Sequence, residues 1–221
     1  MTNEEILHCI DHTLLKAVSS WQEIDKLCAE AVRFKTASVC VPPSYVKPIH
    51  EAYGEKINIC TVIGFPLGYS VCAAKIREAE TALAEGAGEL DMVINLGDVK
   101  NGAFTKVREE ISSLKKTTGN RILKVIVETC YLTEEEKIRL CEIVTAAGAD
   151  YIKTSTGFGA AGAVLSDVVL FKKHIGPGVK IKAAGGVKTR DDLEQFITSG
   201  CERIGTSSAV ALLTGGAAKG Y

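Results

Sequence analysis

The sequence lacks several features that would assign it to common classes of protein. Its eight cysteines include no pair closer than Cys130 and Cys141, so no Cys-x-x-Cys motif is available for zinc binding or redox chemistry. Its longest stretch without a charge, residues 57–74, is interrupted by asparagine, glycine and proline, which is typical of a strand and a loop and not of a membrane span. Residues 1–5 are acidic and form no secretory signal. These absences predict buried, reduced thiols and a cytoplasmic protein with no membrane partner.

The balance of charge excludes a further class. The 26 lysines and arginines nearly cancel the 27 aspartates and glutamates, which leaves a formal net charge of −1. Because non-specific nucleic-acid binding needs a basic face, we expect no nucleic-acid partner. The chain has 221 residues, 46% of them hydrophobic, and no linker or low-complexity tract divides it. We therefore expect one domain over residues 1–221.

Eight short runs have the character of β-strands, and amphipathic segments separate several of them. The runs are residues 10–14, 37–41, 57–63, 89–94, 122–128, 151–154, 179–183 and 203–206. Three of the intervening segments begin with residues that resemble capping boxes: Ser20 with Glu23, Thr133 with Glu136, and Thr189 with Asp192. Apolar residues then follow Ser20 at helical spacing: Ile24, Leu27, Cys28, Ala31 and Val32.

Alternation of strands and helices predicts a parallel sheet, and eight units in a chain of this length are typical of an α/β fold, the (β/α)8 or TIM barrel. An open doubly wound sheet is the alternative, but it usually has fewer strands and a longer glycine fingerprint after the first one. The barrel is therefore the predicted fold.

A repeated unit predicts the direction of three side chains. Each copy begins with a glycine that can cap the preceding helix in the left-handed conformation: Gly86, Gly148 and Gly200. A short link and a strand-like run follow each glycine. Asp91, Lys153 and Gly205 lie in these runs at the same spacing from their glycines. Because side chains alternate along a strand, these three should face the same side of the sheet.

Lys153 is the most informative residue of the chain. It lies in a strand-like run, where a buried ammonium is costly unless it is paired or functional. In residues 179–183 the alternation turns Lys180 and Lys182 to one face. Lys153, Lys182 and Asp91 directed into one interior indicate amine chemistry.

A lysine attacks a carbonyl only as the neutral amine, and its reference pKa of ~10.4 leaves little of that form at pH 7. A second ammonium changes this, since two like charges ~5 Å apart at an effective dielectric of ~20 repel by roughly 3 kcal/mol, or about two pKa units. Lys182 is the candidate neighbour for Lys153, and Asp91 can transfer protons through water.

The last three strand-like runs end in loops of small residues. Glycines let the backbone approach a ligand, and N–H groups and serine hydroxyls donate to phosphate oxygens. Barrels often bind phosphate through the loops after strands seven and eight. The predicted phosphate-binding residues are Gly157, Gly185, Gly186, Gly205, Ser207 and Ser208.

Several other residues keep two interpretations. Asp11 and His12, on the first strand, either assist the substrate hydroxyls or form a structural ion pair. Lys124 and Glu128 share a face in residues 122–128, and pointing inward they would form a buried pair near Lys153.

The remaining candidates lie outside the strands or in a tail. Cys40 either lies near the pocket or is buried as a small hydrophobic residue, which is the favoured interpretation. His50 and His174 are expected on helix surfaces. Tyr221 ends a glycine-rich tail, which either brings its hydroxyl to the site or has no function.

Seven stretches, in order along nearly the whole chain, resemble the deoxyribose-phosphate aldolases. They are residues 11–16, 38–42, 62–68, 90–95, 151–158, 182–187 and 203–208. The Lys-Thr-Ser-Thr-Gly run at 153–157 and the Gly-Phe-Pro-Leu-Gly run at 64–68 are the most specific of them.

The resemblance implies a class I aldolase, with no metal or cofactor, that splits 2-deoxy-D-ribose 5-phosphate into D-glyceraldehyde 3-phosphate and acetaldehyde. Lys153 matches the Schiff-base lysine, Asp91 the acid/base aspartate and Lys182 the second lysine. The glycines and serines of the last loops match phosphate-binding positions. Residues 69–72 and 159–164 depart from the family pattern, which affects substrate preference more than the reaction.

Two other functions remain open. A phosphosugar isomerase on the same barrel would use a carboxylate base and would not need Lys153. A phosphometabolite-binding sensor would bind a phosphosugar without turnover. For any of these, we expect small-molecule phosphosugar or aldehyde ligands and a homo-oligomer, either a dimer or a tetramer.

Overall fold

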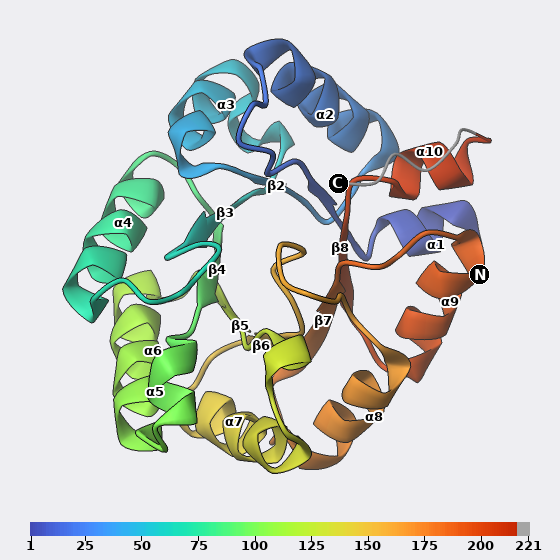
Figure 1. The fold of residues 1–221 in the computed structure, drawn as a ribbon. Helices are drawn as coiled ribbons and strands as arrows, with labels where there is room; N and C mark the ends of the chain where they lie inside the picture. The colour runs from blue at the N-terminus through green and yellow to red at the C-terminus, as the bar shows by residue number, and fades with distance from the viewer. Residues whose placement is uncertain (216–221) are drawn as a thin grey trace.

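The eight predicted strands form a closed parallel barrel (Figure 1). The computed structural model describes residues 1–215. The strands are β1 (Ile10–Thr13), β2 (Ser38–Val41), β3 (Ile59–Ile63), β4 (Glu89–Val93), β5 (Ile122–Ile126), β6 (Tyr151–Lys153), β7 (Lys180–Ala184) and β8 (Arg203–Thr206). Each pairs with its neighbours in the sequence, and β1 pairs with β8 to close the ring. The TIM-barrel prediction is therefore confirmed, and the open sheet is wrong.

Helices surround the strands as an outer ring, as Figure 1 shows in a view along the barrel. They are α1 (Asn3–Leu7), α2 (Trp21–Phe34), α3 (Val46–Tyr53), α4 (Cys72–Ala84), α5 (Leu96–Lys100), α6 (Phe104–Thr118), α7 (Glu134–Ala146), α8 (Leu165–His174), α9 (Arg190–Ser199) and α10 (Ala209–Leu213). Short 3-10 turns are η1 (Pro43–Tyr45), η2 (Gly54–Lys56) and η3 (Thr129–Tyr131). Within residues 1–215 no helix is both long and apolar enough to cross a membrane.

The predicted helix starts and ends are present. All three capping boxes form, at the N-termini of α2, α7 and α9. The three glycines of the repeated unit adopt positive φ: Gly86 (111°), Gly148 (73°) and Gly200 (118°). On α2, four of the five apolar residues are buried, but Val32 is 39% exposed, because it lies at the edge of the buried stripe.

Two compartments with different chemistry lie on either side of the strands. Between the strands and the helices is an apolar core to which the outward side chains contribute, among them Ile10, Val39 and Ile152. Barrel interiors are usually filled by branched apolar residues. Here the inward positions instead include Lys124 and Lys182, both fully buried. A charged interior in place of an apolar one marks the part of the molecule where function should be sought.

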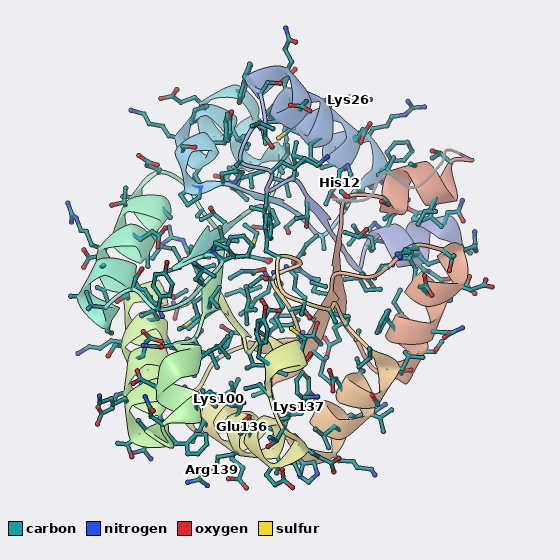
Figure 2. All side chains as sticks on the ribbon, viewed as in Figure 1. His12, Lys26, Lys100, Glu136, Lys137 and Arg139 are labelled. Atoms are coloured by element: carbon teal, nitrogen blue, oxygen red, sulfur yellow. The ribbon has the colours of Figure 1, made fainter. Side chains whose placement is uncertain are left out.

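Ion pairs on the outer ring belong to a different environment. Lys100 on α5 pairs with Glu136 on α7 at 2.6 Å, and Figure 2 shows both at the periphery of the molecule. Arg139 pairs with the exposed Glu142 along α7 at 2.6 Å. Exposed pairs of this kind contribute about 0–1 kcal/mol each, so they do little to hold the ring together.

Candidate active site

Asp91, Lys153 and Lys182 meet inside the barrel. Lys153 ends β6, and Lys182 is its register partner on β7. The Nζ atoms of both lysines donate to the same oxygen, Oδ2 of Asp91 on β4, each over 2.7 Å. None of the three residues is more than 2% exposed. Their convergence follows from the alternation of side chains, because each occupies an inward position of its strand.

Lys124 on β5 extends this cluster toward the other end of the barrel. Its Nζ donates to Oδ1 of Asp91 over 2.9 Å and lies 2.5 Å from Oε2 of Glu89. The same nitrogen is 3.5 Å from Oδ2 of Asp11. Lys124 therefore contacts three carboxylates at once, which offsets the cost of burying its charge.

Asp11 closes the cluster from β1. Its carboxylate accepts hydrogen bonds from Lys182, from Arg203 Nη1 at 2.5 Å and from Ser38 Oγ at 2.8 Å. Arg203 on β8 also donates to Glu89 over 2.9 Å. The resulting hydrogen-bonded network contains four cations and three carboxylates: Lys124, Lys153, Lys182 and Arg203, with Asp11, Glu89 and Asp91.

The network fixes the charge states of its members. Burial alone would raise the pKa of Asp91, but the charges of Lys124, Lys153 and Lys182 outweigh it and hold that pKa well below its usual range. Burial alone would lower the pKa of Lys182, but the Asp11 and Asp91 carboxylates outweigh it and raise that pKa above its usual range. Asp91 is thus a carboxylate and Lys182 an ammonium over the whole physiological pH range.

Gly205 has the inward direction predicted from the repeated unit. A Cβ atom at this position would lie 3.2 Å from Cε of Lys182 and 3.2 Å from Cβ of Ala184. Those distances are shorter than ordinary van der Waals contact. The absence of a side chain at Gly205 therefore leaves the space that the Lys182 side chain occupies.

The six predicted phosphate-binding residues line one pocket of about 230 Å³ at the carboxyl ends of β6, β7 and β8. The pocket includes Gly157, Gly185, Gly186, Gly205, Ser207 and Ser208. Gly185 and Gly186 have φ of 75° and 77°, a backbone conformation that side chains with a Cβ rarely adopt. Parallel strands bring their carboxyl ends to one edge, so loops far apart in the sequence meet there.

Lys188 also lines this pocket, and the sequence interpretation missed it. It is the charged residue among the nine that line the pocket in residues 1–215. Lys188 lies two residues after Gly186, in the loop that leads into α9. A basic residue two positions after a glycine pair, in a loop predicted to bind phosphate, was the signal that could have identified it.

An apolar pocket of about 270 Å³ lies at the same end of the barrel. Leu15, Val62, Phe65 and Phe158 contribute to it. The rings of Phe65 and Phe158 meet edge to face, with centroids 5.3 Å apart. The sequence interpretation did not single out these residues as a group, because they come from strands and loops that only the closed barrel brings together.

The predicted pair of Lys124 and Glu128 is wrong. Strand β5 ends at Ile126, and the backbone of Glu128 turns into the left-handed region with φ of 53°. Glu128 therefore leaves the face of Lys124, and its carboxylate accepts hydrogen bonds from the backbone N–H and the hydroxyl of Thr156. Burial raises the pKa of Glu128 despite these bonds.

Lys180 and His12 each contact a glutamate outside the interior network. Lys180 shares the face of Lys182 but begins its strand, so it lies at the opposite mouth of the barrel, where it is exposed and pairs with Glu202 at 3.0 Å. His12 points away from the interior, and its Nε2 lies 2.9 Å from Glu30 on α2. Figure 2 shows His12 beside that helix. The structural interpretation of His12 is therefore the one that the contacts support, whereas Asp11 belongs to the interior network.

The remaining candidates divide by position. Cys40 is fully buried, as favoured from the sequence, but it also borders the interior cluster, because its Sγ lies within 4.8 Å of a carboxylate oxygen of Asp91. His50 and His174 are exposed on α3 and α8, as expected. Tyr221 lies outside the described residues.

Two sets of donor atoms in residues 1–215 are close enough to hold a metal ion. They are Cys40, Cys60 and Asp91, and Asp11, Cys60 and Glu89. Every carboxylate in these sets is already bonded to lysine or arginine. The positive charge of those partners opposes a metal cation, so the donor chemistry fits ammonium groups better than a metal. Metal-free chemistry stays a prediction.

Comparison with known proteins agrees with this arrangement. The model of the DeoC/LacD family aldolases matches residues 6–218. A deoxyribose-phosphate aldolase of Clostridium botulinum (strain Alaska E43 / Type E3) is 64% identical over 221 residues, which are 100% of both chains. One from Clostridioides difficile (strain 630) is 55% identical, covering 95% of this chain and 96% of its own.

A solved structure supports the same relationship. The tetrameric deoxyribose phosphate aldolase of Aeropyrum pernix superposes with a TM-score of 0.88 at 31% identity, over 96% of this chain and 91% of the other. Sequence and fold thus agree over nearly the whole chain, and the protein belongs to the DeoC/LacD aldolase family, whose members are lyases.

Proposed function

We propose that this protein reversibly cleaves 2-deoxy-D-ribose 5-phosphate to D-glyceraldehyde 3-phosphate and acetaldehyde through a Schiff base on Lys153. The substrate follows from the relatives, which are deoxyribose-phosphate aldolases. The observation that carries the mechanism is the sharing of Asp91 Oδ2 by the ammonium groups of Lys153 and Lys182. This arrangement gives Lys153 a cationic neighbour and a proton acceptor at once.

Lys153 is the lysine whose neutral form disturbs the network least. Lys182 holds both Asp11 and Asp91, and Lys124 contacts those two as well as Glu89. Among the carboxylates of residues 1–215, Lys153 forms an ion pair with Asp91 alone. When Lys153 gives up a proton, Asp91 therefore keeps two cationic partners and no carboxylate loses its last one. The neutral amine can then attack the substrate aldehyde at C1.

Asp91 and Lys182 supply the proton transfers. Attack by the amine gives a carbinolamine, which loses water to form a protonated imine. The imine accepts the electrons of the C2–C3 bond as that bond breaks and the C3 hydroxyl loses its proton, which releases glyceraldehyde 3-phosphate. The enamine that remains gains a proton at C2, and hydrolysis of the imine frees acetaldehyde and Lys153. Asp91 and Lys182 touch the reacting nitrogen or its direct partner, so they are the groups that move these protons.

The two pockets at the carboxyl ends of the strands fit the two ends of this substrate. Backbone N–H groups, serine hydroxyls and Lys188 in the 230 Å³ pocket suit the phosphate. The apolar pocket lined by Val62 and Phe65 suits the carbon atoms of the substrate that carry no charge. Neither feature alone specifies a sugar, but both lie at the end of the barrel where βα-loops form active sites.

A coupled assay of product formation tests this function against its alternatives. Wild-type protein should release acetaldehyde and glyceraldehyde 3-phosphate from the substrate, and Lys153→Arg should release neither, because a guanidinium does not form an imine. An isomerase that uses a carboxylate base would keep its activity in Lys153→Arg. A sensor would bind the phosphosugar without producing either aldehyde, and both results would contradict the proposal.

We also infer that the protein is a homo-oligomer. The Aeropyrum pernix relative is tetrameric. Apolar side chains on the surface of this chain, among them Val18, Tyr69 and Val71, are more than two thirds exposed at 86%, 71% and 72%. Light scattering after size-exclusion chromatography should give a dimer or a tetramer, and a monomer at all concentrations would contradict this.

A further inference from the structure

The thiol of Cys60 contacts the carboxylate at the centre of the network. Cys60 lies on β3 and points inward, with its Sγ 3.1 Å from Oδ1 of Asp91. Lys124 donates to the same sulfur over 3.2 Å. Burial raises the pKa of Cys60 well above its usual range, so the group remains a protonated thiol with one hydrogen to donate. The Cys60 thiol has two further hydrogen-bond partners, the carbonyl of Thr61 at 3.8 Å and the side chain of Cys40, but neither is a carboxylate.

Asp91 thereby has four donors from residues 1–215. Lys153 and Lys182 donate to Oδ2, and Lys124 and Cys60 donate to Oδ1. An ionised carboxylate offers about four acceptor positions. Every position is therefore filled before substrate binds, and the carboxylate is held on both sides.

We infer that Cys60 is a positioning residue that directs proton transfer through Oδ2 of Asp91. The inference rests on the proposed Schiff-base function. When Lys153 becomes an imine, its hydrogen bond to Oδ2 is given up or weakened, and a position opens on that oxygen. Lys124 and Cys60 keep Oδ1 occupied, so the open position is the one nearest the reacting nitrogen. Asp91 can then exchange a proton with the bound intermediate without rotating.

Without the Cys60 thiol, proton transfer would no longer be restricted to Oδ2 of Asp91. In Cys60→Ala, Oδ1 of Asp91 retains Lys124 but gains an open acceptor position, which water or a rotated carboxylate can use. Imine formation itself would continue, because Lys153 keeps its contacts with Asp91 and thus its neighbour Lys182. The steps that suffer are those in which a proton reaches or leaves the intermediate, chiefly protonation of the enamine.

The test compares Cys60→Ala and Cys60→Ser with wild type and with a matched control, Cys141→Ala. Cys141 is a fully buried thiol on α7, outside the interior network. Its variant therefore shows how far the loss of any buried sulfur changes the measured rates. Three quantities are measured: borohydride trapping of acetaldehyde on Lys153, kcat and KM for 2-deoxyribose 5-phosphate, and deuterium exchange into the methyl group of acetaldehyde in heavy water.

We expect Cys60→Ala to trap acetaldehyde on Lys153 and to keep KM, while kcat and the exchange rate fall about tenfold, the effect of losing one hydrogen bond to a charged group. Cys60→Ser should recover most of both rates, since its hydroxyl is also a donor. Unchanged rates in Cys60→Ala, or equal losses in Cys60→Ser and Cys60→Ala, would overturn the positioning role alone. Absence of an adduct in wild type would instead overturn the proposed function, and the positioning role with it.

Discussion

Lys182 and Lys153 are register partners on adjacent strands, and both ammonium groups end at the same oxygen of one aspartate. This relationship places a permanent cation beside the proposed nucleophile. Because the pKa of Lys182 is raised by Asp11 and Asp91, which outweigh its burial, Lys182 is an ammonium when Lys153 attacks the substrate. The carboxylates that each lysine contacts therefore determine which lysine is the proposed nucleophile and which is the neighbouring cation.

Replacing Lys182 by leucine removes the permanent cation. The repulsion between neighbouring ammonium groups is then lost, so the pH profile of kcat/KM should move upward. Lys182→Arg keeps the charge and should move the profile much less. The measurement is kcat/KM from pH 6 to 10, with circular dichroism to verify folding. An unchanged profile in folded Lys182→Leu would remove Lys182 from this role.

Asp11 should contribute to stability in a pH-dependent way. Burial would raise its pKa, but Lys124, Lys182 and Arg203 outweigh burial and hold the pKa well below its usual range. Such a group stabilises the native state fully above the unfolded pKa of ~3.9, and this contribution is lost as the pH falls below it. Asp11→Asn should therefore cost about 3–5 kcal/mol of unfolding free energy at pH 7, and less at pH 3.

Urea unfolding at pH 7, 5 and 3 measures this difference. Glu142→Gln is the control, because it breaks an exposed pair with Arg139 and should change the free energy of unfolding by less than about 1 kcal/mol. A deficit in Asp11→Asn that stays constant across the three pH values would show that the charge of Asp11 does not stabilise the fold.

Lys188 should act on the phosphate and not on the reaction. Lys188→Ala removes a charged donor from the proposed phosphate pocket, so KM for 2-deoxyribose 5-phosphate should rise roughly tenfold while kcat changes by less than about twofold. Unphosphorylated 2-deoxyribose should be turned over equally by variant and wild type. The exposed Lys173 on α8 provides the control variant Lys173→Ala. A matching loss with the unphosphorylated sugar would place Lys188 outside the phosphate site.

Much of this arrangement was predictable because strand periodicity is a local property. Alternation along each run was enough to direct Asp91, Lys153 and Lys182 to one interior, and the parallel order was enough to gather the loops of small residues at one end. The family resemblance then supplied the proposed substrate. The single-domain prediction over residues 1–221 stays a prediction.

Contacts across the barrel were not predictable in the same way. Alternation turns Lys124 inward, but only the closed ring brings it onto Asp91, Glu89 and Asp11. The prediction for Glu128 was wrong because Glu128 itself adopts a left-handed backbone conformation, which ends the alternation of the strand. The pattern of polar and apolar residues does not predict this turn. Lys180 lies on the predicted face of its strand. It is nevertheless exposed to solvent, because it lies at the first position of β7, at the end of the barrel.

Reductive trapping of the imine identifies the lysine that reacts with the substrate. Protein is incubated with acetaldehyde or 2-deoxyribose 5-phosphate, reduced with borohydride and digested for peptide mass spectrometry. We expect a reduced adduct on Lys153 and none on Lys182 or Lys124, because the carboxylates around those two lysines hold them as ammonium groups. An adduct on another lysine, or no adduct in protein that demonstrably turns over the substrate, would contradict this expectation.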